Sequence, residues 1–183
     1  MGEAKRKREE LRQRFLQIVE GWSAAPTEWE TRMVAEVKEL PRMTVRRYPP
    51  HVLAYMNMKQ GECHANCQFM QNEDPDGICQ RVVGWTYTDG QFVLHSVVKR
   101  NDEYFCVTPV PPGFPQEIIF VPDPAITVEE KDGRYIFSRG GEEIRYGLRP
   151  NPAATLEFCN TLRERLNSGM NPYEAMDLAP PEL

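Results

Sequence analysis

The middle of the chain carries the feature that most constrains its fold, a series of short apolar segments separated by turn sequences. Residues 81–88 and 91–99 are rich in Val, Tyr, Phe and Trp, and they flank Asp89-Gly90, a pair typical of tight hairpin turns. Asp132-Gly133 and Gly140-Gly141 separate later segments in the same way. The other expected strands are residues 43–48, 52–58, 104–108, 118–121, 126–130, 135–138 and 144–146. Tight turns join antiparallel neighbours, so the sequence predicts an antiparallel sheet of short strands.

Helical periodicity brackets this strand-rich region. Residues 3–22 place apolar side chains at three- and four-residue steps, and charged residues fill most other positions. Thr27 followed by Glu30 predicts a capping box at the start of a second helix, which Pro41 ends. Residues 63–71 suit a short helix, and residues 152–166 a last one. The predicted fold class is therefore α+β, with N-terminal helices, a short central helix bearing Cys63, and a C-terminal helix.

The length of 183 residues favours one domain with a sizeable core. Within it we expect an N-terminal helical segment at residues 1–41 and an α+β core at residues 42–168. The tail at residues 169–183 ends in a proline pair before Glu182, and we expect it to be loosely held.

Composition excludes several classes of function. The formal net charge of -5 argues against a general nucleic-acid binder, which needs a basic face to displace counterions from phosphates. Neither a bilayer-spanning apolar stretch nor a signal-peptide core is recognisable, so we expect a cytoplasmic protein that does not contact membranes. Its five cysteines would then stay reduced. The sequence carries no nucleotide-binding fingerprint, and no cofactor is expected; the partner is an unknown substrate or protein.

The candidate site centres on Cys63 and His95. A loop containing Gly61 delivers Cys63 to the start of the short helix, where free backbone N–H groups and the helix dipole favour a thiolate and predict a lowered pKa. His95 lies in the strand at residues 91–99. A thiol with a histidine as its base is the arrangement of cysteine-dependent hydrolases and acyl-transferases. Asn66 or Gln60 would orient the pair or stabilise an oxyanion.

Part of the chain resembles a group of uncharacterised bacterial and phage proteins. The shared residues are Gly61-x-Cys63-His64-x-Asn66, Gly84-Trp85, His95-Ser96-Val97-Val98, Thr108-Pro109 and Phe120-Val121-Pro122-Asp123-Pro124, about a third of the chain. The pattern is distantly similar to thiol enzymes of the papain and transglutaminase type. The resemblance implies that Cys63, Asn66 and His95 belong to one site, and it leaves the substrate open.

This chain departs from the group at one position. Proteins of this type often carry an Asp before the Thr-Pro pair as a third catalytic member, whereas here the residues are Cys106-Val107. Asp102 or Asp123 could replace that carboxylate, or Asn66 could orient the histidine. A pair without a third member also retains part of its rate enhancement.

Two alternatives use the same region differently. Four clustered soft ligands, Cys63, His64, Cys67 and Cys79, could close a structural zinc site, although their spacing is unfavourable. The chain could also be a non-enzymatic binding or regulatory protein. Its basic residues 5–8 and proline-rich residues 109–115 would then be contact surfaces.

Overall fold

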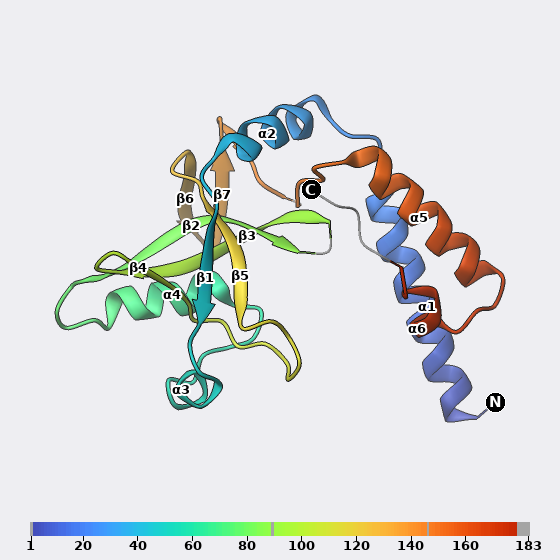
Figure 1. The fold of residues 1–183 in the computed structure, drawn as a ribbon, viewed down its shortest axis with the longest axis horizontal. Helices are drawn as coiled ribbons and strands as arrows, with labels where there is room; N and C mark the ends of the chain where they lie inside the picture. The colour runs from blue at the N-terminus through green and yellow to red at the C-terminus, as the bar shows by residue number, and fades with distance from the viewer. Residues whose placement is uncertain (1, 89, 146, 179–183) are drawn as a thin grey trace. The chain divides into compact units, whose positions relative to one another are not determined.

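The computed structural model describes residues 2–88, 90–145 and 147–178 (Figure 1). The chain forms two compact units, one made of Met1–Val34 with Arg149–Leu183 and the other of Ala35–Leu148. These limits differ from the segments expected from the sequence, which end at residues 41 and 168. No helix of the described residues is long and apolar enough to cross a membrane.

A closed five-stranded barrel forms the larger part of the second unit, with the order β1-β4-β3-β2-β5. The strands are β1 (Met43–Arg47), β2 (Cys79–Thr88), β3 (Gln91–Arg100), β4 (Glu103–Cys106) and β5 (Glu117–Pro122). A separate antiparallel sheet contains β6 (Ile126–Lys131), β7 (Arg134–Arg139) and β8 (Glu142–Glu143). The α+β class is confirmed. The single antiparallel sheet is wrong, because β1 pairs in parallel with β4 and this pairing closes the barrel.

Local turn chemistry explains which strand predictions succeeded. Strands β2 and β3 pair antiparallel from Thr88↔Gln91 to Cys79↔Arg100, as the hairpin signal predicts; Asp89 lies outside the described residues. The strand expected at 52–58 is instead helix α3 (Pro50–Tyr55), because Pro50 at a first helical position has the φ that a helix needs. Instead of a strand at 144–146, the structure has β8 at Glu142–Glu143, and Tyr146 lies outside the described residues.

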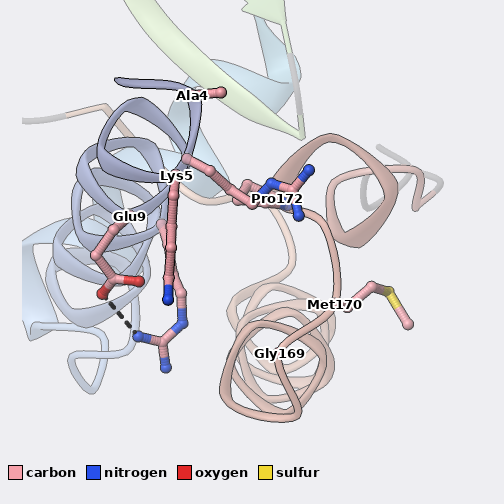
Figure 2. A pocket seen from close by; sticks show the side chains of 8 residues that line it. Ala4, Lys5, Glu9, Gly169, Met170 and Pro172 are labelled. Atoms are coloured by element: carbon pink, nitrogen blue, oxygen red, sulfur yellow. Dashed lines mark hydrogen bonds and ion pairs between the residues drawn. The ribbon is translucent and has the colours of Figure 1, made fainter. Parts of the chain in front are cut away.

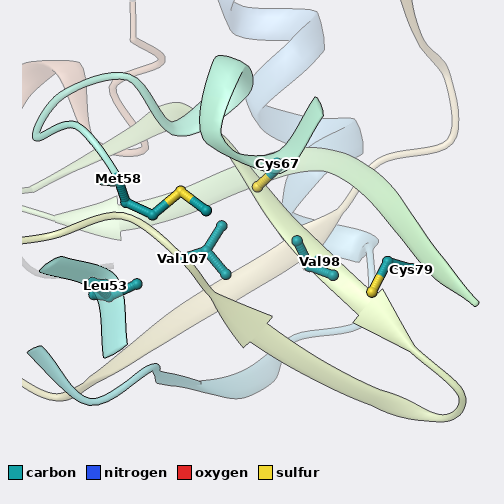
Figure 3. Close-up of a cluster of buried hydrophobic side chains, with 6 residues drawn as sticks. All are labelled: Leu53, Met58, Cys67, Cys79, Val98 and Val107. Carbon is teal, nitrogen blue, oxygen red and sulfur yellow. The ribbon is translucent and has the colours of Figure 1, made fainter. Parts of the chain in front are cut away.

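Buried side chains form one cluster inside the barrel and another under its helices. Val45, Val97, Cys106 and Phe120 make up the inner cluster. Helix α4 (Cys63–Asn72) packs against β2 and β3 (Figure 1). Beneath α3 and α4 lies an outer cluster of Leu53, Met58, Cys67, Cys79, Val98 and Val107 (Figure 3). Val97 and Val98 thus face opposite ways, as strand alternation requires.

Gly84 lets β2 and β5 approach closely. A Cβ atom at this position would lie 2.1 Å from the Val121 carbonyl oxygen and 2.9 Å from the Phe120 ring. Gly84 on β2 pairs with His95 on β3 and with Pro122 on β5. The absent side chain is therefore a packing requirement next to the candidate histidine.

Asp123 is the centre of a buried polar network in the same unit. Its Oδ2 accepts hydrogen bonds from Trp85 Nε1 at 2.8 Å and from Arg139 Nε at 2.7 Å. Arg139 also pairs with Glu36. Asp123 is 2% exposed, so its charge is stabilised by these donors rather than by water.

The first unit is helical. Helix α1 (Glu3–Trp22) packs against α5 (Pro152–Asn167), and the short α6 (Pro172–Ala175) contacts both. Val19, Cys159, Leu162, Leu166 and Ala175 form the core of this unit. The tail after α5 therefore includes a segment that packs into a core; its residues 179–183 lie outside the described part.

Helix α2 (Glu28–Glu39) begins with only half of the predicted capping box. Thr27 Oγ1 accepts from the Glu30 backbone N–H at 3.0 Å, as the sequence predicts. The Glu30 carboxylate instead binds Arg149, with Oε1 2.8 Å from Nε and Oε2 2.6 Å from Nη2. The bidentate pair joins residues 119 positions apart.

The Thr27→Ala variant should lose about 1 kcal/mol of unfolding free energy, because the Glu30 N–H then lacks its side-chain acceptor. Urea unfolding followed by circular dichroism measures this loss. Thr161→Ala is the matched control in the same unit: Thr161 Oγ1 bonds to the Glu157 carbonyl within α5, where alanine favours the helix. Equal losses in the two variants would contradict the capping role.

Candidate functional site

Asn66 fixes the loop that delivers Cys63 to the start of α4. The Asn66 side chain accepts from the Lys59 N–H at 3.0 Å and donates to the Lys59 carbonyl at 2.8 Å. Gly61, with φ 78°, makes the turn between them. At the N-cap, Glu62 makes no side-chain capping bond, which leaves the N–H groups of the first turn available. Asn66 thus holds the loop through the Lys59 backbone, and Gln60 is exposed.

Ser96, the residue after His95, links β3 to the first turn of α4 through a hydrogen bond with His64. Its Oγ lies 2.7 Å from His64 Nδ1, and the His64 and Phe137 ring centroids are 4.2 Å apart, with the ring planes tilted by 40°. The backbone N–H groups of Ser96, His64 and Cys63 itself favour the Cys63 thiolate. Cys63 therefore sits where several main-chain donors converge, among them the N–H of Ser96, the residue after His95.

The His95 ring contacts Cys106, a residue of the inner cluster. The His95 Nε2 atom lies 3.4 Å from Cys106 Sγ, and the ring meets Phe120 edge-on at 6.3 Å. Arg47 donates to the same sulfur at 3.0 Å and to the Thr108 carbonyl at 3.1 Å. The parallel pairing Arg47↔Cys106 of β1 and β4 aligns these side chains.

Burial keeps both the thiol and the imidazole neutral. It raises the pKa of the Cys63 thiol, although the main-chain donors oppose this effect. The prediction of a lowered Cys63 pKa is therefore wrong, since desolvation outweighs the helix start. Burial, with Arg47 and His64 adding to it, lowers the pKa of His95 to about 3. The pKa of His64 falls to about 4, from burial and the nearby Arg81. Neither ring is charged at pH 7.

The structure brings only part of the expected site together. Cys63, His64 and Ser96 meet where α4 packs on β3, whereas the His95 side chain lies on the opposite face of β3, beside Cys106 and Phe120 of the inner cluster. Within the described part of the chain, no hydrogen bond joins Cys63 Sγ to the His95 ring, whose Nε2 faces Cys106. Sequence reasoning missed Arg47 as a member, because only the parallel β1–β4 pairing brings it there.

The two aspartates considered as third members have other environments. The Asp123 carboxylate accepts hydrogen bonds from Trp85 and Arg139. The Asp102 side chain is fully exposed and lies 3.9 Å from Lys99. Cys106 itself therefore occupies the position beside the His95 ring.

The four soft ligands proposed for zinc do not form a metal site. Among the described residues, no group of three or more His, Cys, Asp and Glu side chains is arranged to hold a metal ion. Cys67 and Cys79 belong to the apolar outer cluster (Figure 3), where burial raises the pKa of both thiols. They act as small apolar side chains of this core.

A hollow of about 500 Å³ lies in the helical unit, between α1 and the turn after α5 (Figure 2). Lys5, Arg8 and Arg12 line it together with Glu9, which Arg12 pairs at 3.1 Å. Arg12 also donates to the Leu166 carbonyl at the end of α5. The lining is mainly basic and includes none of the cysteines or histidines of the candidate site.

Comparisons with protein-family models, with curated proteins and with solved structures find no match to this chain.

Proposed function

We propose that this protein is a cysteine-dependent hydrolase or acyl-transferase in which Cys63 is the nucleophile and His95 the base. The observation that carries the proposal is the convergence of main-chain N–H groups on Cys63, among them that of Ser96, the residue after His95, whose Nε2 lies 3.4 Å from Cys106 Sγ. Such donors stabilise the oxyanion that forms when a thiol attacks a carbonyl group.

Both groups rest neutral, so the proposed step is a general-base proton transfer rather than attack from a resting ion pair. The Cys63 sulfur attacks the acyl carbon while its proton passes to His95 Nδ1, the ring nitrogen that Cys106 leaves free. The leaving group departs with that proton, and a thioester remains on Cys63. Water or a second acceptor then attacks the thioester, which releases the acyl group and restores the thiol.

Accessibility favours Cys63 over Cys106 as the nucleophile. Cys63 is 9% exposed, whereas Cys106 has no exposed surface. The proposed nucleophile is therefore Cys63, and Cys106 is left to act on the His95 ring.

p-Nitrophenyl acetate tests the proposal without knowledge of the substrate. The wild type should release p-nitrophenol and carry acetyl on the Cys63 peptide, as mass spectrometry would locate it. Cys63→Ala should abolish this adduct. His95→Gln should slow acylation about 100-fold or more, the usual loss when a general base is removed. Cys159→Ala is the control, because Cys159 is buried in the helical unit.

Acetylation spread over several cysteines, unaffected by His95→Gln, would contradict the enzyme proposal. The remaining candidate would then be the non-enzymatic binding protein, for which the basic hollow beside α1 is the available surface.

A further inference from the structure

We propose that Cys106 is the positioning residue of His95: its sulfur accepts the Nε2–H hydrogen bond and leaves Nδ1 as the basic nitrogen. The catalytic role of this contact rests on the proposed function, whereas the contact between Cys106 and the His95 ring does not depend on it. Cys106 Sγ is the polar side-chain atom beside the ring at 3.4 Å. A thiol thus takes the place where thiol and serine enzymes use an amide or a carboxylate.

Arg47 makes the Cys106 sulfur an acceptor. Its Nη1 donates to Sγ at 3.0 Å and to the Thr108 carbonyl at 3.1 Å, and its Nε donates to the Pro115 carbonyl at 3.2 Å. The bonds to the two carbonyl groups orient the Arg47 guanidinium so that it points at the Cys106 sulfur. A thiol sulfur has two lone pairs as acceptors; the Arg47 and His95 ring nitrogens approach this sulfur, and hydrogen bonds from Thr108 also act on it.

The groups around the His95 ring explain why a thiol serves here. Arg47 on β1 and His64 on α4 both lower the pKa of the ring, and Cys106 on β4 contacts it. Cys106 is also close enough to Cys63 to raise the pKa of that thiol. A carboxylate at position 106 would pair with Arg47 and favour a charged imidazolium. The neutral thiol orients the ring without charging it, so the imidazole stays neutral well below pH 7.

The test is a long-range ¹H–¹⁵N spectrum of the histidine rings, recorded against pH on the full chain without substrate. His→Gln variants at positions 51, 64 and 95 assign the three rings. In the wild type, His95 should be a single tautomer protonated at Nε2. Cys106→Ala should give averaged tautomers, and Cys106→Ser should restore the single one. Cys106→Asp should raise the titration midpoint of His95 by about 1–3 pH units, because a carboxylate favours the charged ring. Cys79→Ala, in the outer cluster, should leave the His95 signals unchanged.

Acylation by p-nitrophenyl acetate supplies the second readout. Cys106→Ala should slow it about tenfold or more through loss of alignment, and Cys106→Ser should recover most of the rate. In Cys106→Asp the acid limb of the rate profile should move to higher pH together with the ring titration.

A wild-type ring protonated at Nδ1, or a ring signal insensitive to Cys106→Ala and Cys106→Asp, would overturn the inference. The expected ring behaviour without any Cys63 acylation would leave the positioning role intact and reject the proposed function. The two failures are therefore distinguishable.

Discussion

Asp123→Ala should destabilise the protein by about 3–5 kcal/mol, because it removes the fully buried carboxylate that pairs with Arg139, whose other carboxylate partner, Glu36, is 47% exposed. The same change removes the acceptor of Trp85 Nε1, an indole donor in a fully buried side chain. Urea unfolding followed by tryptophan fluorescence gives the free energy. The slope with urea concentration should stay close to that of the wild type if the native fold is kept.

Asp102→Ala is the matched control for this experiment. It removes an aspartate of the same unit whose side chain is fully exposed, so the unfolding free energy should change by less than about 0.5 kcal/mol. A loss below about 1 kcal/mol in Asp123→Ala would mean that water or Glu36 compensates Arg139. The hydrogen bonds among Trp85, Asp123 and Arg139 would then contribute little to the unfolding free energy.

Stability should fall by about 4 kcal/mol between pH 7.5 and pH 5 from two histidines alone. The pKa of His64 is lowered to about 4 and that of His95 to about 3, from an unfolded value of 6.5. Below pH 6.5 the unfolded chain therefore binds protons that the folded protein does not, so acid favours unfolding. At pH 5 both native rings are still neutral, and each contributes about 2 kcal/mol to the loss.

Unfolding curves at pH 5, 6 and 7.5 measure this dependence. His64→Gln and His95→Gln should each remove about half of it, whatever they do to stability at pH 7.5. His51→Gln is the control, since His51 is exposed on α3. Unchanged pH dependence in both site variants would show that these imidazoles are hydrated in the native state.

Secondary structure was largely predictable because its causes are local. Periodic apolar residues mark α1 and α5, Thr27 caps α2, and the hairpin signal between β2 and β3 sets their pairing. The short helix that begins at Cys63 was also predicted correctly. One misassigned segment, Pro50–Tyr55, has a side-chain pattern compatible with a strand, and the helical start that Pro50 favours was overlooked.

The sequence alone determined the α+β class, the helix that begins at Cys63 and the strand that carries His95. Only the tertiary structure decided what surrounds them. The parallel pairing of β1 with β4 aligns Arg47 with Cys106, two residues 59 positions apart, and no local pattern encodes such a register. Burial likewise decided the charge states: the helix start alone favours a thiolate, but desolvation, which depends on the packed surroundings, raises the pKa of Cys63 and lowers that of His95. The residue types were readable from the chain, whereas their partners and protonation depend on which strands meet when the barrel closes.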